Sequence, residues 1–173
     1  MTHINSEAHA TRVHQTLWTT DNVLSQTALD LINEYCGYGH VWHMDRTMAR
    51  MSLPPGNDED PFENIGHDMA AWVSDVFSTE IRYRKAKLFL DLPGSEVPLH
   101  TDADNIDVMS QIYLTHSDHP IPGTTFMEPY PFTVPFRYNS GYLNDNRDRK
   151  THRSGFVING YRLSIGFQFY FPR

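Results

Sequence analysis

Seven short segments between residues 85 and 171 constrain the fold of this chain more than any other feature. Each is rich in β-branched and aromatic residues, and Gly, Pro, Asn and Asp separate it from the next. The segments are KAKLFLDL, DVMSQIYLT, GTTFM, FTVPFRY, SGYLN, GFVI and YRLSIGFQFYF. Such a series predicts an antiparallel double sheet of the jelly-roll type over about residues 81–173.

The first 80 residues have a different texture, which predicts helices. In DNVLSQTALDLINEYCG, residues 21–37, apolar side chains recur at three- and four-residue intervals between a polar cap and a glycine stop. Residues 65–81, IGHDMAAWVSDVFSTEI, carry a second apolar stripe. We therefore expect one domain of the α+β class, mainly β, spanning residues 1–173. Its helical lead-in, over about 1–80, should pack on one outer face of a sheet.

Charge and cysteine content argue against several classes of function. The 173 residues carry a formal net charge of −7, which disfavours general binding to nucleic-acid backbones or anionic membranes. No apolar run approaches the roughly 20 residues needed to cross a bilayer, and the first residues lack a signal-peptide pattern. The single cysteine, Cys36, rules out an intrachain disulfide and a cysteine-rich zinc site. We expect a soluble, cytoplasmic protein, whose oligomeric state the sequence does not indicate.

Three H-x-D triplets occur among the ten histidines, and only their context distinguishes them. The triplet at 43–45 lies between the two predicted helices without a strand pattern, which favours surface polar residues. The triplet at 116–118 lies in a turn, where Asp and Ser are expected to bond to the backbone. His100 and Asp102 instead lie between two predicted strands. In an extended segment residues i and i+2 point to the same side, so both side chains can reach one metal ion.

A second histidine, His152, on or beside a late strand, would complete a set of two histidines and one carboxylate. That set leaves three octahedral positions for exogenous ligands and is diagnostic of non-haem Fe(II) oxygenases. Arg162 and Ser164, again i and i+2, place a guanidinium and a hydroxyl on one strand face. Since a guanidinium binds both oxygens of a carboxylate, the pair suits the far end of a dicarboxylate that chelates iron through a 2-oxo acid. Tyr113 would add a phenol hydrogen bond there, with Gln111 beside it.

In order and spacing, these residues resemble a known signature. HTD at 100–102, H at 152 and RLS at 162–164 look like the H-x-D…H…R-x-S signature of the 2-oxoglutarate- and Fe(II)-dependent dioxygenases. The QIYLT segment resembles the prolyl-hydroxylase-like branch. The resemblance covers about residues 84–171, the double-stranded β-helix of that family. It implies that His100, Asp102 and His152 bind Fe(II). It also implies that Arg162 binds the far carboxylate of 2-oxoglutarate, assisted by Ser164 and Tyr113.

The resemblance implies a hydroxylase that consumes 2-oxoglutarate and O2 and releases succinate and CO2. Its primary substrate would be a small molecule or a peptide, oxidised at a C–H bond. The related halogenases lack the carboxylate ligand that Asp102 supplies, so the resemblance favours a hydroxylase over a halogenase. Many members place the arginine nine residues after the second histidine; here the gap is ten, which predicts a small bulge.

Other functions fit the same strands. A cupin-like metal- or ligand-binding module without turnover would share the barrel and the histidines but would not need Arg162 and Ser164. A purely structural jelly roll would bind no metal. The loop NDNRDRKTHR around His152 is either a basic rim that selects an anionic or polar substrate or a solvated charged loop. Its cationic residues are Arg147, Arg149, Lys150 and Arg153.

Overall fold

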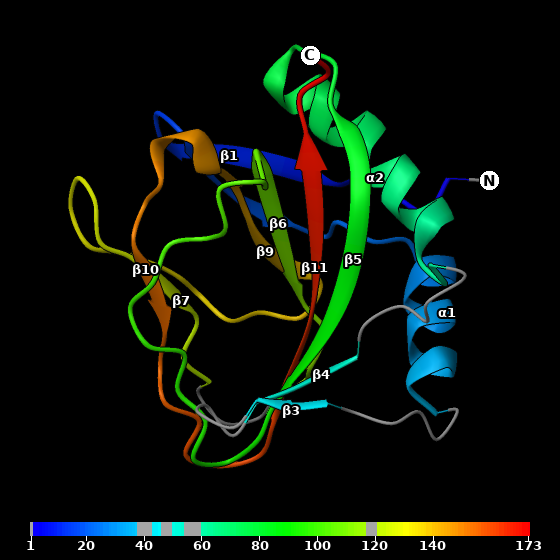
Figure 1. Cartoon of the computed structure of the whole chain (residues 1–173). Coiled ribbons are helices and arrows are strands. Elements are labelled where there is room, and N and C mark those ends of the chain that lie inside the picture. Colours follow the sequence, from blue (N-terminus) through cyan, green and yellow to red (C-terminus); the bar gives the residue numbers. More distant parts are fainter. Residues whose placement is uncertain (1, 38–42, 46–49, 54–59, 117–120) are drawn as a thin grey trace.

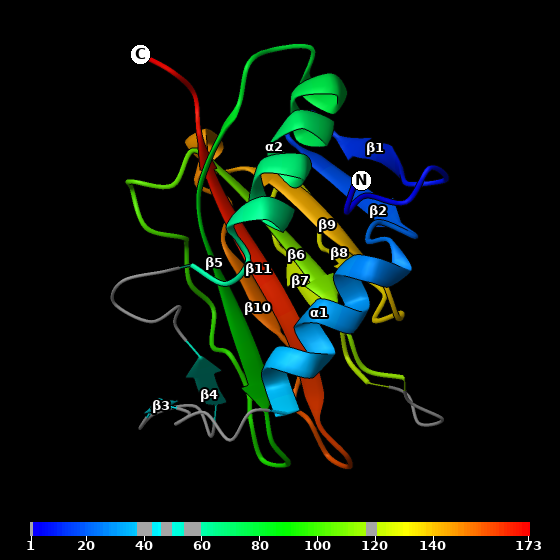
Figure 2. The same ribbon diagram turned by 90° about the vertical axis from the view of Figure 1, so that its right-hand side faces the viewer.

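Two antiparallel sheets and two α-helices make up the fold. The computed structural model describes residues 2–37, 43–45, 50–53, 60–116 and 121–173. The smaller sheet lies against one face of the larger, and both helices lie on the other face (Figures 1 and 2). The mainly β architecture with helices packed on one sheet is therefore confirmed.

The larger sheet has eight strands, and every pairing within it is antiparallel. In spatial order they are β1 (His9–His14), β2 (Leu17–Asp21), β9 (Ser140–Asp145), β6 (Val108–Tyr113), β11 (Arg162–Tyr170), β5 (Arg82–Asp91), β4 (Arg50–Leu53) and β3 (His43–Asp45). The smaller sheet has the order β10 (His152–Ser154), β7 (Thr124–Phe126), β8 (Phe132–Val134). A 3-10 turn, η1 (Asn146–Asp148), follows β9.

The two faces of the larger sheet have different chemistry because side chains alternate along its strands. On β11, Ile165, Phe167 and Phe169 are buried in the core that the helices cover. That core also receives the apolar stripe of α2 (Glu63–Phe77) and of α1 (Gln26–Gly37). Arg162 and Ser164, on the opposite parity of β11, are buried too but make polar contacts. The polar face is thus turned toward the smaller sheet.

The prediction of an entirely helical lead-in over residues 1–80 is wrong. Two strands, β1 and β2, precede α1, and two more lie between the helices. β2 is buried on both faces and pairs with β9, more than 100 residues later, so its pattern resembles neither an alternating strand nor a helix. Helix α1 begins at Gln26 rather than near Asp21, since Asp21 belongs to β2 and Asn22 has a positive φ of 52°.

The β half follows the predicted segments with one exception. Six of the seven contain a strand, but GFVI does not; the strand in that region is β10, immediately before it. Its residues instead bond to a turn, with Val157 N donating to Ser95 O. The predicted bulge between His152 and Arg162 is also absent from the strands. The extra residue lies in the connecting loop, where Gly160 has φ 71°, and the register shift of β11 lies at Gln168/Phe169.

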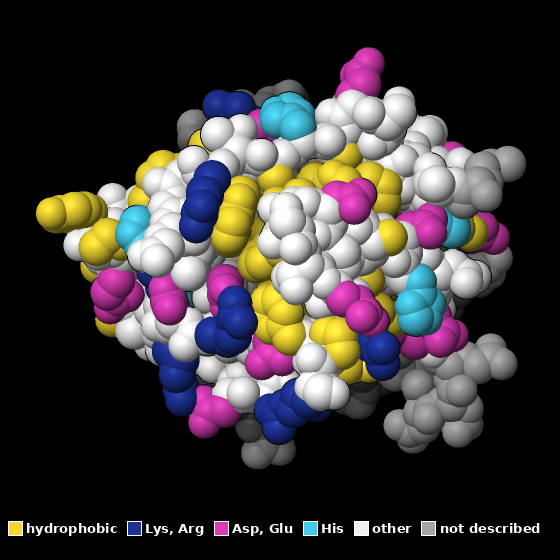
Figure 3. Space-filling model, turned by 90° about the horizontal axis from the view of Figure 1, so that it is seen from above, with side chains coloured by type: hydrophobic (Ala, Val, Ile, Leu, Met, Phe, Trp, Pro, Cys, Tyr) yellow, Lys and Arg dark blue, Asp and Glu magenta, His cyan; other side chains and the backbone are white. Residues whose placement is uncertain are grey.

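Surface charge is mixed on the face seen from above. Figure 3 shows acidic, basic and hydrophobic side chains interspersed there, without a continuous patch of one sign. Of the helices within the described residues, none has the length and apolar character needed to span a membrane.

Close contact between β9 and β6 makes Gly141 sensitive to substitution. A Cβ at this position would lie 1.7 Å from the carbonyl oxygen of Gln111, which is backbone and cannot rotate away. We expect Gly141→Ala to lower the free energy of unfolding by about 1–3 kcal/mol, measured by urea denaturation. Gly37→Ala is the matched control, because a Cβ there meets nothing within 4 Å; it should not destabilise. Equal stabilities of the two variants would contradict the described register.

Candidate active site

A pair of reciprocal backbone hydrogen bonds brings His100 and His152 side by side. The N–H of His100 donates to the carbonyl of His152 (2.9 Å), and the N–H of His152 donates to the carbonyl of His100 (2.8 Å). The contact continues the small sheet beyond β10, since Ser154 N donates to Val97 O at 3.2 Å. The two imidazole rings consequently lie with their centroids 4.4 Å apart.

These two histidines and Asp102 form a cluster that could hold a metal ion. One ligand atom from each residue lies within 4.8 Å of the others. Nδ1 of His100 lies 2.9 Å from Pro98 O, and Nδ1 of His152 lies 3.2 Å from Lys150 O. A carbonyl can only accept, so each Nδ1 carries the proton and each Nε2 keeps its lone pair for a metal.

Asp102 supplies an independent reason to expect a cation. Its Oδ2 atom is buried and has no hydrogen-bond partner among the described residues. Its Oδ1 lies 3.8 Å from Nε2 of His152. A buried carboxylate oxygen without a donor is costly, whereas a divalent ion would satisfy it together with the two imidazoles. The residues present therefore fit a divalent metal.

The other two H-x-D triplets do not form such a cluster among the described residues. His116 is exposed, and its ring stacks on Tyr138 at a centroid distance of 3.6 Å. Asp118 lies outside the described residues, as do the side chains of His43 and Asp45. The context that distinguished His100 and Asp102 in the sequence thus selected the triplet whose side chains meet a second histidine.

The cavity at this cluster is open to solvent, and about 690 Å³ of space free of protein atoms lies within it and at its mouth. Its walls combine the three candidate ligands with uncharged polar and apolar side chains. The lining residues are Phe89, Val97, His100, Asp102, Met109, Gln111, Thr124, Tyr142, His152, Ser154 and Gln168. Of the four residues predicted to contact a cosubstrate, Gln111 lines the cavity, whereas Arg162, Ser164 and Tyr113 lie behind its wall.

A buried hydrogen-bond chain connects three strands of the larger sheet at the cavity wall. Tyr142 OH donates to Oε1 of Gln111, and Nε2 of Gln111 donates to Ser164 Oγ, both at 2.8 Å. Sequence reasoning missed Tyr142, because its segment, SGYLN, contains no motif. The antiparallel register places Tyr142 opposite Gln111 and so brings the two side chains together. These two hydrogen bonds fix the Gln111 amide in one orientation.

Tyr113 contacts the small sheet rather than the cavity. Its hydroxyl donates to Thr124 Oγ1 (2.9 Å) and accepts from Thr124 N (3.1 Å). Burial raises the pKa of the Tyr113 phenol, so it stays protonated and remains a donor. Through Thr124, which does line the cavity, Tyr113 holds β7 against β6.

Arg162 is engaged by groups of the protein itself. Its Nε donates to Oδ2 of Asp91 at 2.7 Å, and its Nη2 lies 2.7 Å from the same oxygen as the ion-pair contact. Nη2 also donates to Ser154 Oγ (2.6 Å), and Nη1 donates to Pro122 O (2.8 Å). Arg162 and Asp91 are 1% and 0% exposed, respectively. The carboxylate that lies on the Arg162 guanidinium in this structure belongs to the chain itself, whereas the sequence predicted the carboxylate of a cosubstrate there.

Two arginines of the basic loop, Arg147 and Arg149, make different contacts. Arg147 bonds to Asp145 through Nε (2.9 Å) and Nη2 (2.7 Å), and its guanidinium lies 4.0 Å from the Phe171 ring centroid. Arg149 pairs with Asp104 and donates to Thr101 Oγ1. Arg149 is thus the cation that reaches the HTD segment, whereas Arg147 is held by other contacts.

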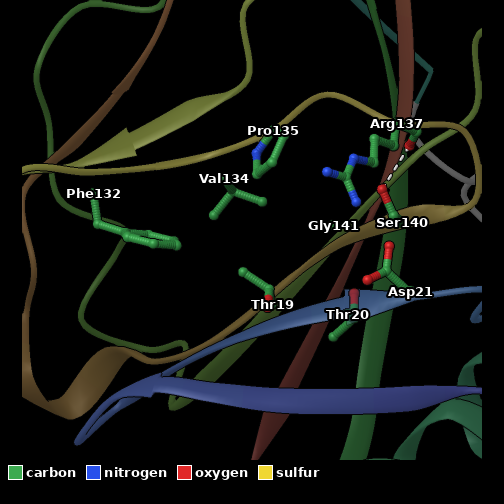
Figure 4. Close-up of a pocket in the computed structure, with 9 residues that line it drawn as sticks. All are labelled: Thr19, Thr20, Asp21, Phe132, Val134, Pro135, Arg137, Ser140 and Gly141. Carbon is green, nitrogen blue, oxygen red and sulfur yellow. Dashed lines mark hydrogen bonds between the residues drawn. The ribbon is translucent and has the colours of Figure 1, made fainter.

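A second cavity lies between β2, β9 and the β8 segment, as Figure 4 shows. It is open to solvent and holds about 520 Å³ of space free of protein atoms, and Asp21, Arg137 and Ser140 border it opposite the apolar Phe132 and Val134. None of the three candidate metal ligands lines it. Among the described residues, the cluster that could hold a metal lines the first cavity, called the triad cavity below.

Comparison with solved structures identifies the fold. HygX from Streptomyces hygroscopicus, solved with nickel and 2-oxoglutarate bound, has a TM-score of 0.70 and 13% identity over 90% of this chain and 83% of its own. A 2OG-Fe(II) oxygenase family protein from Burkholderia pseudomallei has a TM-score of 0.68 and 14% identity over 84% and 80%. The chain has the fold of the 2-oxoglutarate- and Fe(II)-dependent oxygenases. No family model and no curated protein matches its sequence.

The likeness extends to the prolyl-hydroxylase branch of this fold. A prolyl hydroxylase from Trichoplax adhaerens, solved with a hypoxia inducible factor peptide fragment, has a TM-score of 0.66 and 16% identity over 90% of this chain and 83% of its own. At these identities the structures share the arrangement of the backbone. The function of this chain depends on its own side chains.

Removing a candidate ligand should weaken metal binding strongly. We expect the protein to bind one Ni(II) or Co(II) ion, measured by titration calorimetry. Asp102→Ala or His152→Ala should weaken that binding at least about 100-fold, since only two of the three ligands remain. His116→Ala should bind as the unaltered protein does, because His116 lies outside the cluster. Retained binding in both ligand variants would show that the ion sits elsewhere.

Arg162 should matter for stability independently of any ligand. Arg162→Met breaks the buried ion pair with Asp91, so we expect the free energy of unfolding to fall by about 3–5 kcal/mol. Adding Asp91→Asn removes the buried carboxylate charge and should restore part of the loss, which a double-mutant cycle in urea measures. Additive effects of the two substitutions would contradict the buried ion pair.

Proposed function

We propose that the protein is a non-haem Fe(II)- and 2-oxoglutarate-dependent oxygenase that hydroxylates a C–H bond and releases succinate and CO2. The observation that carries the proposal is the cluster of His100, His152 and Asp102 in the wall of a cavity of this fold. The buried Oδ2 atom of Asp102 has no hydrogen-bond partner among the described residues. In the same proposal the two facing sheets are the halves of a double-stranded β-helix.

The three ligands would hold iron through two Nε2 atoms and one carboxylate. When bound, Fe(II) with 2-oxoglutarate supplies O2 activation coupled to oxidative decarboxylation. The protein contributes the orientation of the ligands: the backbone bridge fixes the two rings, and the carbonyls of Pro98 and Lys150 fix their tautomers. Asn146 holds the segment after Asp102 by donating to Ala103 O and Ile106 O.

The cavity wall formed by Gln111, Thr124 and Ser154 would receive the far end of the cosubstrate. Gln111 is held there by Tyr142 and Ser164, while Tyr113 and Arg162 hold Thr124 and Ser154, whose side chains line the cavity. Among these groups only Arg162 carries charge. Its contact with the cavity runs through Ser154 Oγ, which accepts from Arg162 Nη2 and Val97 N and so keeps its own proton to donate.

A small molecule or a peptide is the expected primary substrate. HygX has also been solved with hygromycin B bound, and the Trichoplax enzyme with a peptide, so this fold takes both classes. Arg149, which contacts Thr101 in the HTD segment, would favour a polar or anionic group at the mouth. The net charge of −7 disfavours nucleic-acid backbones, and we propose a cytoplasmic location.

A cupin-like metal-binding module without turnover is the second candidate. One specific observation favours it: the guanidinium of Arg162, which an oxygenase would use for 2-oxoglutarate, contacts Asp91 instead. Such a module would bind the metal at the same cluster but would give no succinate. The two candidates therefore differ in turnover and not in metal content.

Succinate release tests the proposed function. With Fe(II), 2-oxoglutarate and O2, we expect succinate across a panel of small-molecule and peptide substrates, and none without O2. Asp102→Ala should reduce the rate at least about 100-fold, since it removes a ligand, whereas His116→Ala should not change it. Metal binding without succinate from any substrate would support the cupin-like module, and unchanged turnover in Asp102→Ala would refute the assigned site.

A further inference from the structure

The contact between Asp91 and Arg162 bears on which 2-oxo acid the cavity accepts. The two residues are direct cross-strand partners, Asp91 at the end of β5 and Arg162 at the start of β11. Both Nε and Nη2 of Arg162 point to the same Asp91 oxygen at 2.7 Å. That edge of the guanidinium, one of the two that can bind a carboxylate with two parallel bonds, is occupied.

The second edge, between Nη1 and Nη2, is also engaged. Nη2 donates to Ser154 Oγ, and Nη1 donates to Pro122 O. Each of the three guanidinium nitrogens therefore donates a hydrogen bond within the protein. A second carboxylate could bind two protons of Arg162 only by displacing Asp91 or by separating the guanidinium from Ser154.

Asp91 is held in a way that opposes displacement. It is 0% exposed, and its other oxygen, Oδ1, accepts from the buried Ser95 Oγ at 3.5 Å. Moving it off Arg162 would break an ion pair and a 2.7 Å hydrogen bond between two buried side chains, which is strongly unfavourable. A carboxylate that approached without displacing it would meet a like charge across a single guanidinium.

We propose that Asp91 determines specificity at the cosubstrate end of the cavity by occupying the Arg162 guanidinium, and that it weakens binding of a 2-oxo acid whose far end is a carboxylate. The proposal rests on the proposed function, because it concerns the cosubstrate of that site. The far end of the cosubstrate would meet the hydroxyls of Ser154 and Thr124, which line the cavity. Hydroxyls accept an uncharged polar or apolar end with less discrimination than a guanidinium does.

Binding to protein loaded with Zn(II), which supports no turnover, tests this directly. The two probes are 2-oxoglutarate and 2-oxopentanoate, which has the same chain length but a methyl group in place of the far carboxylate. We expect the unaltered protein to prefer 2-oxoglutarate by less than about tenfold. Asp91→Asn, which keeps the shape and removes the charge, should bind 2-oxoglutarate at least about tenfold more tightly and 2-oxopentanoate within about threefold of the unaltered protein.

Asp145→Asn is the matched control. Asp145 is a buried carboxylate bonded to an arginine, Arg147, but neither residue lines the triad cavity. This variant should leave both affinities unchanged. Thermal unfolding of each variant shows whether it is folded, and the preference of the unaltered protein stands as evidence if Asp91→Asn does not fold.

The outcomes separate the inference from the function on which it rests. If 2-oxoglutarate binds and Asp91→Asn binds it equally or more weakly, Asp91 orients Arg162 and the inference is overturned. A preference for 2-oxoglutarate above about 100-fold in the unaltered protein overturns it as well, because a two-bond contact to a guanidinium would then be operating. If neither 2-oxo acid binds any variant while Zn(II) does, the proposed function fails and the inference fails with it.

Discussion

The reciprocal hydrogen bonds between His100 and His152 are the contact on which the candidate site depends. They join two segments that lie far apart in sequence and place two imidazoles within reach of one ion. The same pairing seats Ser154 against Val97, and Ser154 in turn accepts from Arg162. A slip of one residue in the segment that carries His152 would turn His152 away from His100 and Asp102 and would separate Ser154 from the guanidinium.

The larger sheet separates stability from chemistry by alternation. Its outer face buries Ile165, Phe167 and Phe169 under the helices, in one apolar core. Its inner face buries polar side chains instead, and several of them have their partner on another strand: Gln111 with Ser164, Arg162 with Asp91. These cross-strand bonds satisfy groups that would be costly to bury alone, and they fix the orientation of the side chains that make them.

Local patterns allowed a large part of the fold to be predicted. Strong apolar periodicity located both helices to within a few residues, and β-rich segments between turn residues located six strands of the second half. β1 and β2 were missed because their strand character depends on pairing with β9, far along the chain. The GFVI segment was predicted as a strand because it is rich in β-forming residues. It is not one, because the edge strand β7 pairs with residues 152–154, immediately before it.

The donor types of the candidate metal site and the shared side of His100 and Asp102 follow from the sequence, because an extended backbone puts residues i and i+2 on one side. The same spacing predicts that Arg162 and Ser164 share one strand face. What Arg162 binds follows from the three-dimensional arrangement of the strands instead. Its partner, Asp91, is 71 residues away and meets it solely through the antiparallel register of β5 and β11. A guanidinium binds whichever carboxylate the fold brings to it, and motif spacing carries no information about that choice.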